Sequence, residues 1–215
     1  MNILCINGSP RGLESNTNIM IQAILKGFES STSRITNIFL SEKQIGYCKG
    51  CHSCWFKTPG KCVIKDDMEK IIQQLLESDI VILGSPLYFN NISGTLKVFF
   101  DRLTSIGGNP HKNENIKGNK KTTSFIMVSN CGFPHRSQFD VISLWINNVV
   151  KMLQVDLIGE FYATNGKILT QPEDDQITRR KNYLEYLTNC GKELLKNGKL
   201  SDKLRELSKK EILEF

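Results

Sequence analysis

Four cysteines stand close together in the first third of the chain. They form the pattern C-x2-C-x2-C-x7-C within fifteen residues, at Cys48, Cys51, Cys54 and Cys62. A four-iron four-sulfur cluster takes three thiolates from a tight turn and a fourth from nearby, which this spacing supplies. Four thiolates also satisfy a tetrahedral zinc site. Because a metal needs all four side chains turned toward one point, a structural, metal-free role stays open beside these two.

A polar loop follows the first apolar run of the chain. The run is Ile3–Ile6, and the loop Gly8–Thr17 (GSPRGLESNT) leads into a helical pattern. Hydroxyls and free amides at a helix N-terminus favour an anion, and Arg11 adds a positive charge. The loop has neither the Gly-Lys-Ser/Thr of a triphosphate-binding loop nor the G-x-G-x-x-G of a dinucleotide fold. It therefore predicts a phosphate monoester site, and its alternative is an ordinary Ser/Asn-rich helix cap.

The apolar run and this loop together contain the C-x5-R spacing of another enzyme class. Cys5 and Arg11 resemble the pair of the low-molecular-weight phosphotyrosine phosphatases. In such an enzyme the cysteine is an accessible thiolate nucleophile. Here Cys5 lies inside the apolar run, and Gly12 replaces the hydroxyl residue expected after the arginine. We therefore expect Cys5 to be a buried strand residue and rank the phosphatase last.

Two further polar loops follow apolar runs. In Ser85–Asn91 (SPLYFNN), Tyr88 and Phe89 suit a planar aromatic ligand, although both side chains could pack on the next helix instead. In Asn130–His135 (NCGFPH), the glycine lets the backbone approach a ligand closely. The histidine at the end of this loop has no base or metal partner in the pattern, so a surface position is favoured.

Short apolar runs alternate with amphipathic stretches along the whole chain. Strands are expected at 3–6, 34–40, 79–84, 122–129 and 155–163. Helices are expected at 16–29, from Asp66 onward, and at 93–105, 137–153 and 173–197. Asp66 is expected to cap its helix with Glu69 as capping-box partner. Residues 106–121 predict an exposed loop, and 201–214 an amphipathic helix.

This alternation predicts an α/β fold, a doubly wound parallel sheet of five strands with helices on both faces. In such sheets ligands bind beyond the carboxyl ends of the strands, at the switch point. The three polar loops, at 8–17, 85–92 and 130–135, all leave carboxyl ends. We therefore expect them to converge on one site.

The chain as a whole resembles the flavodoxin-like NAD(P)H-dependent FMN reductases, and within them the iron–sulfur flavoproteins. The resemblance is carried by Gly8–Thr17, Cys48–Met68, Gly84–Tyr88 and Leu96–Arg102, and it runs from residue 1 to about 165. It implies the flavodoxin-like strand order 2-1-3-4-5 with FMN at the first switch point. It also implies that Asp101 and Arg102 tie their helix to its surroundings.

The resemblance further assigns the site residues. The FMN phosphate would be bound by Ser9, Arg11, Ser15, Asn16 and Thr17. The isoalloxazine would be bordered by Pro86, Leu87, Tyr88, Phe89, Asn130, Cys131, Gly132 and Phe133. Hydride transfer is the chemistry of the cofactor itself, so no catalytic side chain is expected. Trp55 could cover the site, or it could simply pack locally.

The activity implied is that of an FMN-dependent oxidoreductase. NADH or NADPH would reduce bound FMN, and the electrons would pass to a quinone, a nitro- or azo-aromatic, free flavin or a protein acceptor. The alternative is an iron–sulfur flavoprotein that carries electrons between redox proteins. The resemblance also implies a homodimer or homotetramer.

Composition excludes several other classes. The net charge of +6 comes from 28 basic and 22 acidic side chains that are interleaved, so no nucleic-acid surface is expected. No apolar run approaches the ~20 residues of a membrane span. An odd cysteine count of seven without a secretory signal favours a reducing compartment, the cytoplasm. With no linker visible, we expect a domain over 1–198, with a cysteine-rich loop at 44–65, and a helical tail over 199–215.

Overall fold

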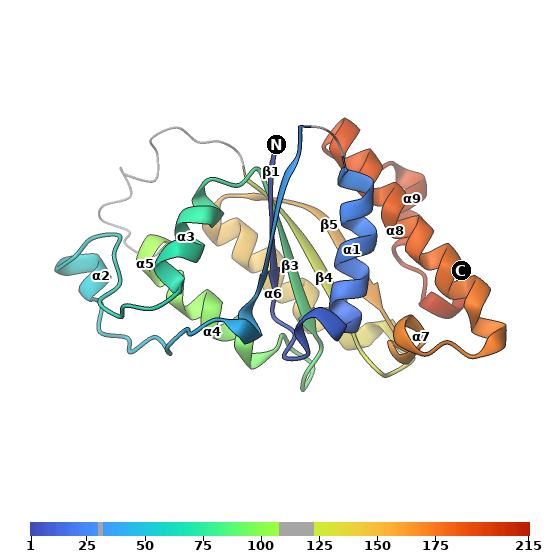
Figure 1. The fold of residues 1–215 in the computed structure, drawn as a ribbon, viewed down its shortest axis with the longest axis horizontal. Coiled ribbons are helices and arrows are strands. Elements are labelled where there is room, and N and C mark those ends of the chain that lie inside the picture. The colour runs from blue at the N-terminus through green and yellow to red at the C-terminus, as the bar shows by residue number, and fades with distance from the viewer. Residues whose placement is uncertain (30–31, 108–122) are drawn as a thin grey trace.

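A five-stranded parallel sheet forms the centre of the protein (Figure 1). The structure is a computed structural model, and it describes residues 1–29, 32–107 and 123–215. The strands are β1 (Asn2–Asn7), β2 (Arg34–Phe39), β3 (Ile80–Pro86), β4 (Ser124–Asn130) and β5 (Asp156–Ala163). Their order is β2-β1-β3-β4-β5, with every pair parallel, so the predicted doubly wound order is confirmed.

The central strands are apolar because both of their faces are covered. Every residue of β3 is buried, and so is every residue of β1 after Asn2. The predicted end of the third strand at Gly84 was too early, because Ser85 and Pro86 still pair with β4. A proline is tolerated there because it stands at the very end of the strand.

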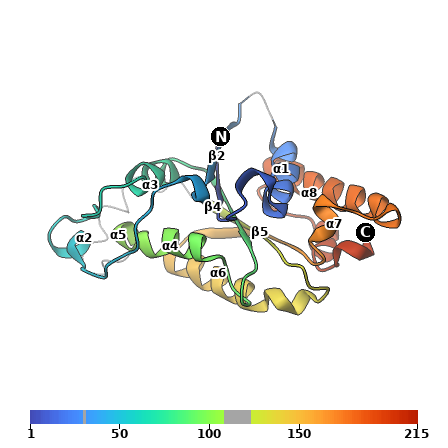
Figure 2. The ribbon, with the colours of Figure 1, turned by 60° about the horizontal axis from the view of Figure 1, so that its bottom comes forward.

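Helices cover both faces of the sheet (Figure 2). One face is covered by α1 (Asn16–Phe28) and α8 (Ile177–Asn197), whose buried side chains share a core cluster with Ile3, Ile82 and Val128. The other face is covered by α3 (Met68–Leu76), α4 (Gly94–Arg102) and α6 (Asp140–Leu153), which pack on Leu4, Leu83 and others. No helix in these described ranges is long and apolar enough to cross a membrane.

Helices α1 and α8 touch through two glycines. A Cβ on Gly27 would lie 2.2 Å from the carbonyl oxygen of Thr188, and a Cβ on Gly191 would lie 2.2 Å from that of Ile24. Real Cβ atoms do not approach other atoms so closely, so any side chain here would force the helices apart. The α8 helix is thereby held against the helix that begins at the first polar loop.

Several predicted helices are divided or shortened. The helix expected at 93–105 is split into α4 and α5 (Thr104–Gly107), and those expected from 137 and 173 begin as 3-10 turns at Arg136–Phe139 and Asp174–Gln176. Three other short helices are α2 (Ser53–Phe56), α7 (Lys167–Thr170) and α9 (Asp202–Leu207). The loop expected at 106–121 lies outside the described residues from 108 onward.

The C-terminal tail is not the single helix expected over 201–214. After α9 a separate turn at Ile212–Glu214 has its own capping box, in which Glu211 and Glu214 bond each other's backbone N–H groups. Leu204 and Ile212 are both buried in the cluster beneath α8. The tail therefore packs on the sheet domain of its own chain.

Candidate functional site

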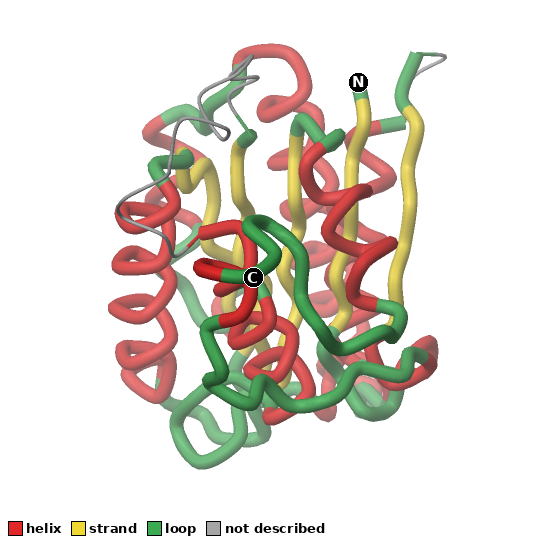
Figure 3. The backbone as a smooth tube through the Cα atoms, turned by 90° about the vertical axis from the view of Figure 1, so that its left-hand side faces the viewer, coloured by secondary structure: helices red, strands yellow, loops and turns green. Residues whose placement is uncertain are grey.

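The loops at the carboxyl ends of the strands meet at one edge of the sheet (Figure 3). The backbone N–H of Gly8 donates to the carbonyl of Gly84 at 2.7 Å, which joins the first loop to the second. The N–H of Leu87 donates to the carbonyl of Asn130 at 2.9 Å, which joins the second to the third. The side-chain amide of Asn130 donates to Thr17 Oγ1 at 2.7 Å and so joins the third to the first. The structure thus brings the three loops together.

The first loop is folded by its own hydroxyls. Ser15 Oγ accepts from the N–H of Asn18 at 3.1 Å as the N-cap of α1, and it donates to the carbonyl of Gly12 at 2.6 Å. Gly12 has φ +52°, a left-handed conformation that glycine adopts at little cost. The hydroxyl of Ser15 therefore shapes the loop, while Asn16 and Thr17 form the first turn of α1, where backbone N–H groups lack helical partners.

The two other residues predicted to bind the phosphate lie before the 3-10 turn of this loop. Ser9 Oγ accepts from the backbone N–H of Arg11 at 3.3 Å, which leaves its hydrogen free to donate. The Arg11 guanidinium is exposed and donates to the carbonyl of Glu14 at 3.2 Å. Arg11 is therefore placed at the surface of the loop, where it can swing toward an anion.

A fourth loop, which the sequence analysis missed, completes this edge. It follows β5 and contains Thr164, Asn165 and Gly166. The N–H of Asn165 donates to the carbonyl of Phe133 at 3.0 Å, and that of Gly166 donates to the carbonyl of Cys131 at 2.7 Å. The Asn-Gly pair after a predicted strand is the turn signal that could have identified it.

Partnerless buried polar atoms concentrate at this edge. Among the described residues, eight buried side-chain N or O atoms have no hydrogen-bond partner. Five of the eight lie at the carboxyl ends of strands or at the start of α1: Asn7 Nδ2, Asn16 Oδ1, Ser129 Oγ, Thr164 Oγ1 and Asn165 Nδ2. Buried polar groups are normally satisfied. Such a set fits a ligand with several polar groups of its own, as FMN has in its phosphate and ribityl chain.

The second loop presents aromatic side chains on a strained turn. Tyr88 and Asn91 exchange backbone hydrogen bonds of 2.8 and 3.0 Å around a tight turn. Phe89 and Asn90 at its tip have φ of +48° and +58°. Asparagine adopts this left-handed conformation readily, whereas for phenylalanine it costs about 1–2 kcal/mol. The Phe89 side chain is fully exposed, and Tyr88 is half-exposed. Strain of this kind is typical of functional sites.

The remaining predicted ring-binding residues lie beside this turn. Pro86 and Leu87 are buried at the end of β3. In the third loop Cys131 is buried, whereas Gly132 and Phe133 are exposed. Burial raises the pKa of the Cys131 thiol, which donates to the carbonyl of Phe133 at 3.4 Å. This thiol therefore supports the turn and stays protonated at neutral pH.

Cys5 does not belong to this site. It is fully buried in β1, and burial raises the pKa of its thiol to about 12. A thiol in that state is no nucleophile at neutral pH. The expectation that Cys5 is a buried strand residue is confirmed, and the phosphatase interpretation has no accessible thiolate to carry it.

The cysteine segment lies beside α5 and the C-terminal end of α4. Cys48 and Cys51 are exposed, and Cys54 and Cys62 are half-buried. Burial is the main reason that the pKa of the Cys54 thiol is raised. Trp55 Nε1 donates to the carbonyl of Thr104 at 2.9 Å, so this ring packs on α5 rather than over the loops.

Thiolates are the donors that iron–sulfur clusters take, so the chemistry of this set fits a cluster. In the described ranges, no three or more Cys, His, Asp or Glu side chains are arranged to hold a single metal ion. The four thiols would therefore have to turn toward one another to ligate a cluster. The four thiols are suitable ligands for a cluster, and their coming together depends on how the backbone of the cysteine segment is held.

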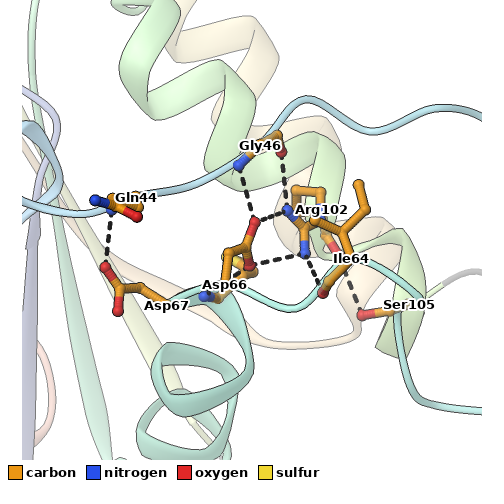
Figure 4. Close-up of polar contacts among 8 residues, drawn as sticks. Gln44, Gly46, Ile64, Asp66, Asp67, Arg102 and Ser105 are labelled. Atoms are coloured by element: carbon orange, nitrogen blue, oxygen red, sulfur yellow. Dashed lines mark hydrogen bonds and ion pairs between the residues drawn. The ribbon is translucent and has the colours of Figure 1, made fainter.

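A buried ion pair holds this segment to α4 (Figure 4). The Arg102 guanidinium, at the end of α4, meets the Asp66 carboxylate through two contacts, Nη1 to Oδ2 at 2.5 Å and Nη2 to Oδ1 at 3.0 Å. The side chains are only 1% and 9% exposed. Burial alone would raise the pKa of Asp66, but the hydrogen bond from Arg102 and two backbone N–H groups lower it.

The same pair explains why the predicted cap of α3 was wrong. Asp67, not Asp66, occupies the N-cap position, and its carboxylate accepts from the N–H of Gln44 at 2.8 Å instead of capping the helix. Glu69 forms a surface ion pair with Lys65 at 3.6 Å. Asp66 still accepts from the first helical N–H, but its charge is neutralised by Arg102. The conformation at the start of α3 is therefore set by the buried guanidinium of Arg102 and not by the local capping pattern.

A groove of about 650 Å³ runs along the free edge of β5, away from the strained turn. It lies between α6 and the start of the C-terminal tail, and its charged lining includes Arg136, Glu160 and Arg205. Glu160 accepts from the hydroxyl of Tyr162 at 2.7 Å. The groove contains none of the residues predicted to bind FMN.

Comparisons with known proteins agree with this geometry. The family model of the NADPH-dependent FMN reductases matches residues 1–151. The chain is 32% identical over 184 residues to an iron-sulfur flavoprotein of Archaeoglobus fulgidus, which covers 86% of this chain and 77% of that protein. With other iron-sulfur flavoproteins the match covers about half of this chain and about half of theirs.

Two solved structures show the same fold. One is an FMN-dependent NADH-azoreductase from Bacillus anthracis in complex with FMN, with a TM-score of 0.63 and 15% identity over 90% of this chain and 99% of that one. The other is an NAD(P)H:quinone oxidoreductase from Methanothermobacter marburgensis, with a TM-score of 0.60 and 14% identity over 90% and 95%. The doubly wound sheet is therefore shared with both.

Proposed function

The chain belongs to the NADPH-dependent FMN reductase family, and from this premise we propose that it is an FMN-dependent NAD(P)H oxidoreductase. Electrons pass from NADH or NADPH through bound FMN to a quinone, a nitro- or azo-aromatic, free flavin or a protein acceptor. The observation that carries this proposal is the set of five partnerless buried polar atoms at the carboxyl edge of the sheet. They lie where a doubly wound sheet binds its ligand.

The first loop binds the FMN phosphate. Ser9, Asn16 and Thr17 offer hydroxyl and amide groups beside the N-terminus of α1, whose dipole favours the dianion, and Arg11 closes over it. Thr17 Oγ1 accepts from Asn130, so its own hydrogen is free to donate to a phosphate oxygen. Ser15 contributes by capping α1 and shaping the loop.

The second and third loops border the flavin ring. Pro86 and Leu87 form one wall, and the turn over 130–133 forms another. When bound, FMN supplies hydride acceptance and electron transfer, so no side chain has to act as a general acid or base. Tyr88, Phe89 and Phe133 present exposed aromatic surface on which nicotinamide and the acceptor can stack in turn.

This site lies at an exposed apolar part of the molecule. Leu13, Tyr88, Phe89 and Phe133 are all exposed apolar side chains of the site loops. Exposed apolar surface of this kind is typical of protein–protein contacts, which supports a homodimer or homotetramer with the site near a subunit boundary. The seven free cysteines of the structure support a reducing compartment such as the cytoplasm.

Steady-state kinetics test the proposed activity. Protein loaded with FMN is mixed with NADPH or NADH and with a quinone or an azo dye, and apoprotein without FMN is the control. We expect acceptor reduction only by the FMN-loaded protein. If the FMN-loaded protein oxidises neither nucleotide with any of these acceptors, the proposed reductase function is wrong.

The cysteine segment favours a second candidate, an iron–sulfur flavoprotein that carries electrons between redox proteins. Cys48, Cys51, Cys54 and Cys62 would hold the cluster, which supplies one-electron transfer. Iron and acid-labile sulfide analysis of anaerobically purified protein separates the two candidates. Stoichiometric iron and sulfide, with flavin reduced by a ferredoxin but not by NADPH, would favour the carrier.

A further inference from the structure

One side chain holds both ends of the segment that carries the four cysteines. Arg102 Nη1 donates to the carbonyl of Gly46, two residues before the first cysteine, at 2.8 Å. Arg102 Nη2 donates to the carbonyl of Ile64, two residues after the last, at 3.5 Å (Figure 4). Asp66 adds a third link, because its carboxylate accepts from the N–H of Gly46 at 2.9 Å. The segment 46–64 is thus a loop closed at one buried point.

The chemistry of this point requires an arginine. A guanidinium is planar and carries five N–H donors, so it can bind a carboxylate with two atoms and still reach carbonyls on either side. A lysine has one nitrogen and cannot join two chain segments and both carboxylate oxygens in the same plane. The side chain is almost fully buried, so its charge is balanced by these protein contacts rather than by water.

The guanidinium also lies beside the last cysteine. Cys62 stands two residues before Ile64, whose carbonyl accepts from Arg102 Nη2. An ion pair that only fastened α4 to α3 would have no need of contacts with both ends of the cysteine segment.

We propose that Arg102 is a positioning residue for the cysteine segment: it closes residues 46–64 into a loop and sets a fixed positive charge beside Cys62, so that the four thiols can ligate one cluster. This inference rests on the second candidate function, in which the cysteines hold iron. Groups behind metal ligands orient them and tune the metal, and their loss commonly weakens metal binding by about 10- to 100-fold. A positive charge beside the cluster also raises its reduction potential.

Variants at the clamp test this role. Arg102→Lys keeps a charge but loses the planar fork, Arg102→Gln loses the charge, and Asp66→Asn keeps the shape of the partner. The matched control is Asp101→Asn, because Asp101 is the neighbouring residue of α4 and forms an exposed ion pair with Lys97. Each protein is reconstituted anaerobically with iron, sulfide and FMN, and its iron, sulfide and FMN are measured per chain.

We expect Asp101→Asn to match the parent chain. We expect Arg102→Lys to retain FMN but to hold iron about 10- to 100-fold more weakly against a chelator. Limited proteolysis should cut within 46–64 much faster in Arg102→Lys and Asp66→Asn than in the control. The reduction potential of any cluster that Arg102→Gln still binds should be lower.

Two results with the variants would overturn the proposal. One is an Arg102→Lys protein that has the same iron content, the same reduction potential and the same protease resistance as the parent chain. The other is a variant that loses iron, FMN and thermal stability in parallel, which would mean that the ion pair is purely structural. A parent chain that takes up no iron would also refute the proposal, while NADPH-dependent reduction of its FMN would leave the reductase function standing.

Discussion

The hydrogen bond between Thr17 and Asn130 allows a sharp test of the phosphate-binding loop. Thr17→Val replaces the hydroxyl by a methyl group of the same size, at a side chain that is 1% exposed. It leaves the Asn130 amide, 2.7 Å from the lost oxygen, without its acceptor. A buried donor left unsatisfied costs about 1–3 kcal/mol, so the free energy of unfolding of the apoprotein should fall by that amount.

FMN binding should suffer a second loss. A hydrogen bond to a charged group contributes about 1.5–3 kcal/mol, so without the Thr17 hydroxyl the Kd for FMN should rise by about 10- to 150-fold. Riboflavin has the same ring and ribityl chain without the phosphate, so its affinity should change far less. Flavin fluorescence titrations with both ligands, on Thr17→Val and on the Thr17→Ser control that keeps the hydroxyl, measure this difference. Equal weakening of FMN and riboflavin would show that the hydroxyl does not face the phosphate.

Four further predictions concern the turn, the helix contact, the buried thiol and the ion pair. Phe89→Gly removes left-handed strain, so unfolding in denaturant should show unchanged stability or a gain of about 1 kcal/mol. The KM for an aromatic acceptor should rise, and an unchanged KM would refute a stacking role for Phe89. Gly191→Ala places a Cβ against a carbonyl of α1 and should lower the free energy of unfolding by about 1–3 kcal/mol in a urea titration. Cys5→Ser should leave FMN binding and NADPH oxidation intact, and a phosphatase activity abolished by it would contradict the flavin assignment. Pairing with Arg102 lowers the pKa of Asp66, so the unfolded state binds the proton more readily than the folded state. The pair therefore stabilises the fold above about pH 4, and this stabilisation is lost as the pH falls through the folded-state pKa. When the free energy of unfolding is measured against pH, Asp66→Asn should show a smaller loss of stability in acid.

The sheet and the meeting of three loops could be predicted because both follow from local patterns. Continuous apolar runs such as Ile80–Leu83 mark buried strands, and parallel strands place their carboxyl ends together. The burial of Cys5 followed in the same way, because its neighbours on both sides are apolar. The loop after β5 carries an Asn-Gly signal that local analysis could have used.

The clamp could not be predicted, because its partners are far apart in the chain. Asp66 and Arg102 are separated by 36 residues, and Gly46 and Arg102 by 56. The local pattern around Asp66 predicts a helix cap, and that rule was overridden by a buried charge that requires a partner. The resemblance did indicate that Arg102 ties its helix to its surroundings, but not that the tie encloses the four cysteines.

The central claim is that this chain binds FMN at the carboxyl edge of its sheet and accepts electrons there from a nicotinamide. An anaerobic titration of FMN-loaded protein with NADPH, followed in the visible flavin bands, tests it most directly. We expect the bands to bleach as NADPH is added and to return when a quinone is added without oxygen. Protein that fails to retain FMN, or that retains it with bands unchanged by both NADPH and NADH, would contradict the account.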